Sequence, residues 1–326
     1  MLFLGDCLCV AGNAPETALD LEKQVVKSRQ SIRSGKGELL RYRLSSAKKE
    51  QALHYEFAFE GKKLRYDTPQ LKRIRNDGRM YRFFDDGKND DELILTIRDA
   101  DNPGGLSNVP DARLLGLAPI ILGHLHAMEY HNIFERPDRE DSVVRRESVK
   151  DTECWYVEVS HLSGKKSRFW IDENRGYNLL RCEIEEVFKG DRLVDTIDVE
   201  LKLWGKTWFP KQIDYARTVN GRRHQMERIE LANLVFGEDV DDELFEVASL
   251  DLPVGTIVSE LPRPRNGSRV WNGAQLVSRD EIKAGVDMAQ QGTSSILRSG
   301  FVVANCLLAV FFFVVFLKKR YVSTGN

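Results

Sequence analysis

The densest set of side chains with metal-binding chemistry is a histidine cluster at residues 124–131. It contains His124, His126, Glu129 and His131. Imidazole and carboxylate groups are ligands that zinc takes in proteins. If the segment is a helix, His124 and His131 share a face, but His126 points about 160° away from His124. The spacing also differs from HExxH. We therefore expect a polar helix surface or a cavity rim here, and no metal or other cofactor.

Two groups of acidic residues could also do chemistry. Residues 85–92 read Asp-Asp-Gly-Lys-Asn-Asp-Asp-Glu, which suggests calcium but lacks the alternating oxygen ligands and terminal Glu of an EF-hand loop. An acidic hairpin turn is the better interpretation. A carboxylate pair for acid–base catalysis could come from a second group, which instead alternates outward on expected strands and fits a solvated face: Asp172, Glu173, Glu183, Glu185 and Glu186.

No known nucleophile, phosphate-binding or dinucleotide-binding pattern occurs in the chain. We therefore predict no catalytic residue and do not expect an enzyme. Two cysteines, Cys154 and Cys182, lie in the body of the chain, and an oxidising compartment would allow them to pair. No cysteine or histidine spacing indicates zinc. Two small buried thiols are the favoured interpretation.

The amino-acid composition limits the class of binding partner. The chain has 326 residues, which is enough for one large domain or two small ones. Charged residues make up 30%, and the formal net charge is −2. Nucleic-acid binding needs a basic excess or stripe, so this class of partner is not expected.

The end of the chain predicts a membrane anchor. Residues 301–317 are apolar except for Asn305, and Lys318-Lys319-Arg320 follow directly. About 17 apolar residues are the lower limit for a helix that spans a bilayer. Basic residues beside a span favour the cytoplasmic side. We expect a transmembrane helix at 298–318 and a cytoplasmic tail at 319–326, with the main domain outside. A buried core helix is the alternative.

The start of the chain is hydrophobic but short. Residues 1–14 lack a basic region, Asp6 interrupts them, and Pro15 would follow a cleavage site. Two alternatives stay open. This stretch is the remnant of a signal peptide that starts upstream, or the C-terminal helix itself directs insertion.

The body, residues 15–258, predicts a mainly β domain. Thr17 and Asp20 form a helix-capping pattern, so residues 17–33 should be helical. Alternating apolar and polar residues from 40 to 97 and from 155 to 234 then predict roughly eleven strands, with Asn220-Gly221 as a hairpin turn. Residues 111–131 break the alternation and predict a helical insert. Residues 259–297 contain few apolar groups and predict a polar spacer.

Several segments resemble the periplasmic lipoprotein carriers and receptors of the LolA/LolB-like superfamily. Residues 168–181 read Arg-Phe-Trp-Ile-Asp-Glu-Asn-Arg-Gly-Tyr-Asn-Leu-Leu-Arg, which is similar to a hairpin of that superfamily, and Trp208-Phe-Pro-Lys-Gln212 is similar to a later strand start. Residues 111–117 and 252–256 look like elements of exported families of planctomycete-type bacteria. The resemblance implies a half-barrel, an α+β fold with a curved antiparallel sheet, over residues 17–258.

The same resemblance implies an apolar ligand. In the superfamily, the concave face of the sheet holds acyl chains and is partly closed by helices. The residues of this chain that would face inward are Tyr42, Leu53, Tyr55, Phe57, Phe59, Tyr81, Phe83, Leu95, Trp155, Phe169 and Ile171. The C-terminal anchor differs from the soluble carriers and from the receptor, which has an N-terminal lipid.

Three hypotheses for function follow. The first is a protein tethered to a bacterial inner membrane by one span, with its domain in the periplasm, that binds a lipid, an acyl chain or a lipoprotein or envelope partner. The second is an envelope sensor or scaffold that acts through a membrane partner. The third is an enzyme whose site leaves no local motif. The sequence identifies no protein partner.

Overall fold

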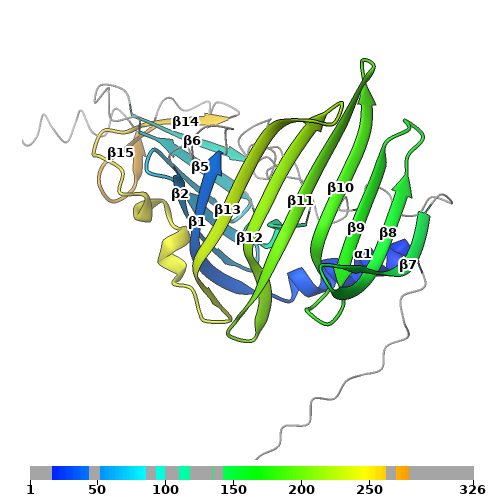
Figure 1. Ribbon diagram of the computed structural model, residues 1–326. Coiled ribbons are helices and arrows are strands. Elements are labelled where there is room, and N and C mark those ends of the chain that lie inside the picture. Colours follow the sequence, from blue (N-terminus) through cyan, green and yellow to red (C-terminus); the bar gives the residue numbers. More distant parts are fainter. Residues whose placement is uncertain are drawn as a thin grey trace, which may run out of the picture.

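The computed structural model describes residues 17–43, 52–85, 93–99, 109, 111–117, 134, 142–261 and 269–278. These residues form a mainly β protein, in which one open, curved sheet of 16 strands carries a single α-helix (Figure 1). The mainly β class and the N-terminal helix are therefore confirmed. No helix in this part of the chain has the length and apolar character needed to cross a membrane.

The elements, in chain order, are α1 (Ala18–Gln30), β1 (Ser34–Arg43), β2 (Leu53–Glu60), β3 (Lys63–Asp67), β4 (Leu71–Asn76), β5 (Arg79–Phe84), β6 (Ile94–Asp99), η2 (Ala112–Leu114), β7 (Ser142–Val149), β8 (Thr152–Ser160), β9 (Lys166–Asp172), β10 (Asn178–Phe188), β11 (Asp191–Trp204), β12 (Thr207–Val219), β13 (Arg222–Phe236), η5 (Asp242–Phe245), η6 (Val247–Leu250), β14 (Ile257–Leu261), β15 (Arg269–Trp271) and β16 (Leu276–Ser278). The predicted membrane span at 298–318, the N-terminal stretch 1–14 and the histidine cluster at 124–131 lie outside the described residues.

The strands follow the order β16-β15-β14-β6-β5-β4-β3-β2-β1-β13-β12-β11-β10-β9-β8-β7. Neighbouring strands are antiparallel, except that β14 runs parallel to β6. The hairpin predicted at Asn220-Gly221 is confirmed, because these two residues join β12 to β13. Both have positive φ, at 50° and 76°, which a tight two-residue turn requires.

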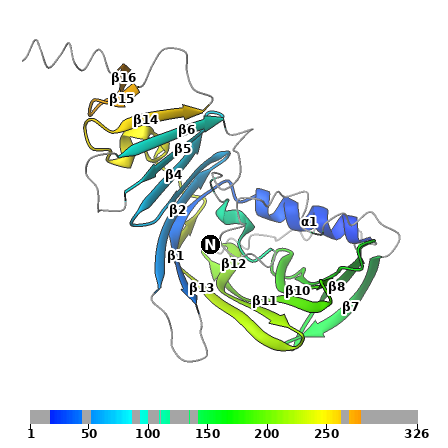
Figure 2. The same ribbon diagram turned by 90° about the horizontal axis from the view of Figure 1, so that it is seen from above.

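The sheet has two parts that meet at β1. Strands β13 to β7 curl around α1 and form a half-barrel, while β2 to β6 and β14 continue away from the helix (Figure 2). We call β2 to β6 together with β14 the wing. The face of the sheet toward α1 is the concave face.

Two apolar cores lie on opposite faces of the wing. Phe57 and Phe59 of β2 pack in the concave core together with Leu21 and Val25 of α1. Ala58, between the two phenylalanines, packs in a second core on the other face. The strand alternation explains this division, since successive side chains of a strand point to opposite faces. Strands β4, β5 and β6 add Ile74, Phe83, Leu95 and Ile97 to this second core, and η5, η6, β14 and β15 also contribute to it.

Two predicted segments differ from the structure. Within the expected spacer 259–297, the end of β14 and the strands β15 and β16 belong to the sheet, because Val270 and Trp271 bury their side chains there. Within the expected helical insert, residues 111–117 form the short η2 turn and then leave helical geometry at Gly116, whose φ is +77°. A Cβ at Gly116 would lie 2.9 Å from the Pro210 ring, so the turn packs directly on β12.

Candidate functional site

The concave face is covered by α1, which begins at the predicted cap. The Thr17 hydroxyl accepts a hydrogen bond from the backbone N–H of Asp20 at 3.1 Å and donates one to the Asp20 carboxylate at 2.7 Å. The helix buries only three apolar side chains, Ala18, Leu21 and Val25. The helical period places them on one side, toward the sheet.

Two charged side chains share that buried side of α1. Glu22 accepts a hydrogen bond from the backbone N–H of Phe134 at 3.0 Å. Arg29 donates to the carbonyl of Arg113 at 3.2 Å and lies over the ring of Phe209, 4.5 Å from its centroid. These two side chains bond to Phe134 and to η2, and Arg29 also contacts the sheet at Phe209, so α1 is held by a few specific bonds as well as by apolar packing.

The eleven candidate residues divide between the two cores. Four lie buried in the concave core, namely Phe57, Phe59, Phe169 and Ile171, with Tyr55 and Trp155 partly buried against it. Three others belong to the opposite core of the wing, namely Phe83, Leu95 and the partly buried Tyr81. Leu53 is 50% exposed, and Tyr42 is partly exposed with its hydroxyl 3.3 Å from Glu230. One apolar face does not hold all eleven, and their contact with a ligand stays a prediction.

A buried ion pair in β1 and β13 was not among the candidate residues. Arg41 binds Glu227 through two hydrogen bonds, from Nε at 2.9 Å and from Nη2 at 2.7 Å. Burial acts to lower the pKa of Arg41, but hydrogen bonds and charge from Glu227 and Tyr55 outweigh it and raise the pKa. The sequence pattern had placed Tyr42 inward and Arg41 outward, whereas the structure buries Leu39 and Arg41.

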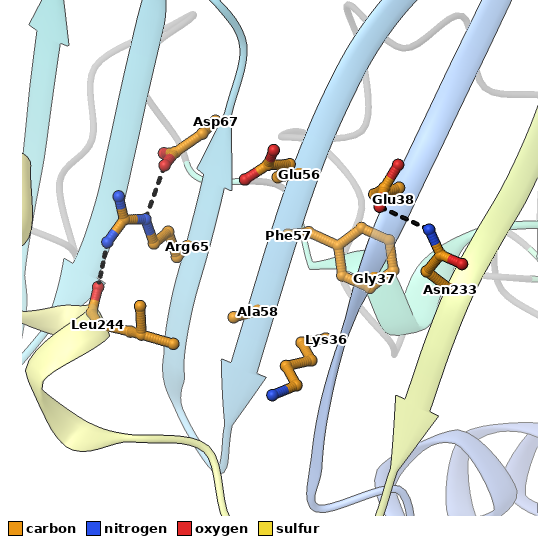
Figure 3. Close-up of a pocket in the computed structure, with 10 residues that line it drawn as sticks. All are labelled: Lys36, Gly37, Glu38, Glu56, Phe57, Ala58, Arg65, Asp67, Asn233 and Leu244. Atoms are coloured by element: carbon orange, nitrogen blue, oxygen red, sulfur yellow. Dashed lines mark hydrogen bonds and ion pairs between the residues drawn. The ribbon is translucent and has the colours of Figure 1, made fainter.

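A pocket of about 390 Å³ lies where β1, β2 and β3 meet η5 (Figure 3). Its lining includes the charged side chains of Glu38, Glu56, Arg65 and Asp67. Glu38 and Asp67 each lie directly opposite Glu56 in the sheet, so three carboxylates form one row. Ala58, which belongs to the core opposite the concave face, also lines the pocket. The pocket therefore opens beside the core opposite the concave face, and Phe57 of the concave core also contributes to its lining.

Neighbouring groups balance the charge of this carboxylate row. Arg65 binds Asp67 at 2.7 Å and the carbonyl of Leu244 at 2.8 Å (Figure 3). Burial nevertheless raises the pKa of Asp67. Glu38 accepts hydrogen bonds from Asn233 at 2.7 Å and lies 3.0 Å from His54, and these contacts lower its pKa. The charged part of this lining suits water and ions better than an acyl chain.

The other sequence candidates are placed as follows. Glu183 and Glu185 both bind Arg168 on the sheet, as expected for a partly solvated face. Asp172 differs, because its side chain is buried and holds Arg175 at 2.9 Å. Among the described residues, no group of three or more His, Cys, Asp or Glu side chains could hold a metal ion.

The two body cysteines are buried, and no disulfide bond joins them. Cys182 belongs to the concave core, whereas Cys154 packs with Tyr156 and Trp170 in a third core. Burial raises the pKa of the Cys154 thiol to about 11. The two thiols therefore lie in separate packing environments, which agrees with the favoured interpretation of two small buried thiols.

The fold and the site together define a class of protein. It is an open half-barrel made of one sheet, with a helix on the concave face. No family model matches the chain, and no curated protein matches it in sequence. Solved structures do match. A LolA superfamily protein from Nitrosomonas europaea is 13% identical with a TM-score of 0.41, and the match covers 71% of this chain and 98% of that one.

Two further solved structures are similar in the same way. A DUF1329 family protein from Desulfovibrio piger is 15% identical, with a TM-score of 0.43 and coverage of 73% of this chain and 100% of that one. An outer membrane lipoprotein-sorting protein domain from Vibrio parahaemolyticus is 12% identical, with a TM-score of 0.41 and coverage of 71% and 99%.

Proposed function

We propose that this chain is a membrane-tethered extracytoplasmic protein that binds a lipid or acyl chain, carried free or on a lipoprotein, on the concave face of its sheet. The observation that carries the proposal is that a helix, α1, covers the concave face of the sheet. The concave core contains Leu39, Phe57, Phe59 and Phe169, and among the described residues its largest cover is α1. A helix is not hydrogen-bonded into the sheet, so it can shift without breaking the strand ladder.

The free energies of burial support the idea that an acyl chain can displace α1 from the concave face. Full burial of Leu21 and Val25 stabilises the packed helix by about 1.5–3 kcal/mol each. An acyl chain gains about 0.8 kcal/mol for each buried methylene group. A chain of about eight methylene groups therefore offsets the loss of both side-chain contacts. An acyl chain of ordinary lipid length can compete with α1 for the concave face.

A photoreactive fatty acid tests this proposal. The full chain, reconstituted in lipid nanodiscs, is irradiated with a diazirine-bearing fatty acid, and the labelled peptides are mapped by mass spectrometry. We expect labels on concave-face strands such as β2 and β9. Labels confined to residues 299–317 would mean that only the membrane segment meets the lipid, and the proposal would fall.

The chain offers a matched pair of control variants. Phe57 and Phe83 are 3% and 4% exposed and lie on opposite faces of the wing. Replacing either with Ala costs about 3–5 kcal/mol, so the two variants are matched in stability. Phe57→Ala should reduce labelling of the concave face, and Phe83→Ala should not. Phe57→Leu and Phe83→Leu repeat the comparison if the alanine variants do not fold.

The membrane tether is tested by extraction. The full chain should remain in the membrane pellet after washing with alkaline carbonate, while a chain that ends at Leu297 should be released. Protease added to intact spheroplasts should digest the β domain if that domain lies outside the cytoplasm. Release of the full chain by carbonate would contradict the tether.

A further inference from the structure

The concave face continues from the aromatic core onto the wing, where its side chains form rows across the strands. Residues directly opposite one another in neighbouring strands point to the same face. One row, which we call the central row, consists of Phe57, Tyr66, Arg73, Arg82, Thr96 and Ser259. Phe57 and Tyr66 belong to the concave core, which places the whole row on the concave face.

Arginines gather on this face of the wing strands that the structure describes. A second row places Arg75 and Arg98 on the same face as Arg73 and Arg82. No Asp or Glu in the described wing strands occupies that face. The opposite face of the wing differs, because Lys63, Arg65 and Lys72 each pair there with a carboxylate.

Arg73 and Arg82 lie directly opposite each other on β4 and β5. Like charges in this position repel. Arg73 lies over the Tyr66 ring, 5.1 Å from its centroid, and burial together with Arg82 lowers its pKa. Within the described residues, neither Arg75 nor Arg82 has a carboxylate partner. An anion placed among these guanidinium groups would relieve the repulsion.

Tyr66 provides a second, independent observation. Its side chain is 1% exposed, and its hydroxyl has no hydrogen-bond partner among the described residues. Buried hydroxyl groups normally have a partner, because water no longer serves as one. Tyr66 lies between Phe57 and Arg73 in the central row. An acceptor oxygen beside Arg73 would satisfy this hydroxyl.

Apolar surface borders the cations. Phe84 and Ile94 are directly opposite each other on β5 and β6, in the row next to the central row. They are 47% and 41% exposed. The face therefore changes from buried aromatic residues near β1 to arginines with exposed apolar neighbours on the wing. This change from an apolar to a cationic surface fits a ligand with an apolar tail and an anionic head.

We propose that Arg73, Arg75, Arg82 and Tyr66 bind the phosphate of an anionic lipid headgroup, whose acyl chain extends toward the concave core. Arginine donates paired hydrogen bonds to phosphate oxygens, and a phosphate has more acceptor oxygens than a carboxylate for several guanidinium groups. This inference rests on the proposed function, since it names the headgroup of the same ligand.

The test measures binding of dodecyl phosphate to the full chain in dodecyl maltoside micelles by isothermal titration calorimetry. Arg82→Gln and Arg75→Gln should each weaken binding about tenfold to a hundredfold, as expected for lost charge-assisted hydrogen bonds. Tyr66→Phe keeps the ring and removes the hydroxyl, so it should weaken binding by a smaller factor. Binding should also weaken as the salt concentration rises.

Arg79→Gln is the matched control, because Arg79 is exposed and lies on the opposite face of β5. It should leave binding within about twofold, since the chain loses the same charge away from the site. Equal losses for Arg79→Gln and Arg82→Gln would show non-specific attraction and overturn the proposal. Unchanged binding in Arg75→Gln and Arg82→Gln would overturn it too.

One further titration identifies the source of the phosphate, and the photolabelling result separates the headgroup site from the proposed function. Inorganic phosphate should bind much more weakly than dodecyl phosphate, and equal binding would indicate a free-phosphate site and overturn the lipid assignment. If photolabelling of the concave face fails while Arg82→Gln still weakens binding, the proposed function falls and the headgroup site stands. If photolabelling of the concave face succeeds while Arg82→Gln leaves binding unchanged, the headgroup site falls and the proposed function stands.

Discussion

Arg41 and Glu227 form a two-point ion pair that is almost completely removed from solvent. The side chains of the two residues are 9% and 1% exposed. They join β1 to β13, the strands at which the half-barrel meets the wing. The pair therefore fixes the centre of the sheet with a polar contact beside the apolar concave core.

Removal of one partner of this pair should destabilise the protein strongly. Arg41→Met or Glu227→Leu leaves a buried charge alone, which costs about 3–5 kcal/mol. The double variant should lose much less unfolding free energy than the two single variants lose together, because neither charge remains buried without its partner. Urea unfolding of the four proteins, followed by tryptophan fluorescence, gives the coupling energy. Asp214→Asn in the exposed Arg228–Asp214 pair is the control and should cost no more than about 1 kcal/mol.

Gly37 and Leu234 are packed so closely that position 37 has no room for a side chain. A Cβ at Gly37 would overlap the Leu234 methyl group and lie 3.3 Å from the carbonyl oxygen of Ala232. Gly37→Ala should therefore cost about 1–3 kcal/mol by overpacking. Leu234→Ala opens that space, so Gly37→Ala should cost much less in that background. An equal cost in both backgrounds, measured by thermal unfolding, would contradict this explanation.

The sequence predicted those parts of the fold that local rules determine. The cap at Thr17, the Asn220-Gly221 turn and the period-2 alternation each act over a few residues, and each appears in the structure. The strands β15 and β16 were not predicted, because each spans only three residues and is held by a few contacts with the rest of the sheet.

The candidate site was predicted less completely because it depends on partners distant in the chain. Arg41 reads as an outward residue until Glu227, on the paired strand β13, is known. The arginines of the wing look like ordinary polar positions of alternating strands. Only the register, which places Arg73 opposite Arg82, shows that they share one face. Register follows from pairing across the whole sheet, which local alternation alone leaves open.

Cys154 should make the stability of the protein fall at alkaline pH. Burial raises the pKa of its thiol to about 11 in the folded chain, whereas an exposed thiol has a pKa near 8.5. The folded state then holds a proton that the unfolded state loses, so this stabilising contribution is present below about pH 8.5 and is lost as the pH rises toward 11. Thermal unfolding between pH 7 and pH 10.5 measures the effect. Cys154→Ala should show a shallower decline, and an identical decline would contradict the assignment.

Arg82→Gln should make the protein more stable while it weakens phosphate binding. The substitution removes one of two like charges that lie directly opposite each other, and such pairs destabilise a sheet by about 0.2–1 kcal/mol. The gain should be largest at low ionic strength, because salt screens the repulsion between Arg73 and Arg82. Melting temperatures of the wild-type and variant chains, measured in 20 mM and in 500 mM salt, test this expectation. Arg79→Gln, on the opposite face of the same strand, should not show the same gain. Residues kept at a cost in stability are typical of binding sites, so a loss of stability in Arg82→Gln would instead mark Arg82 as part of the structural framework.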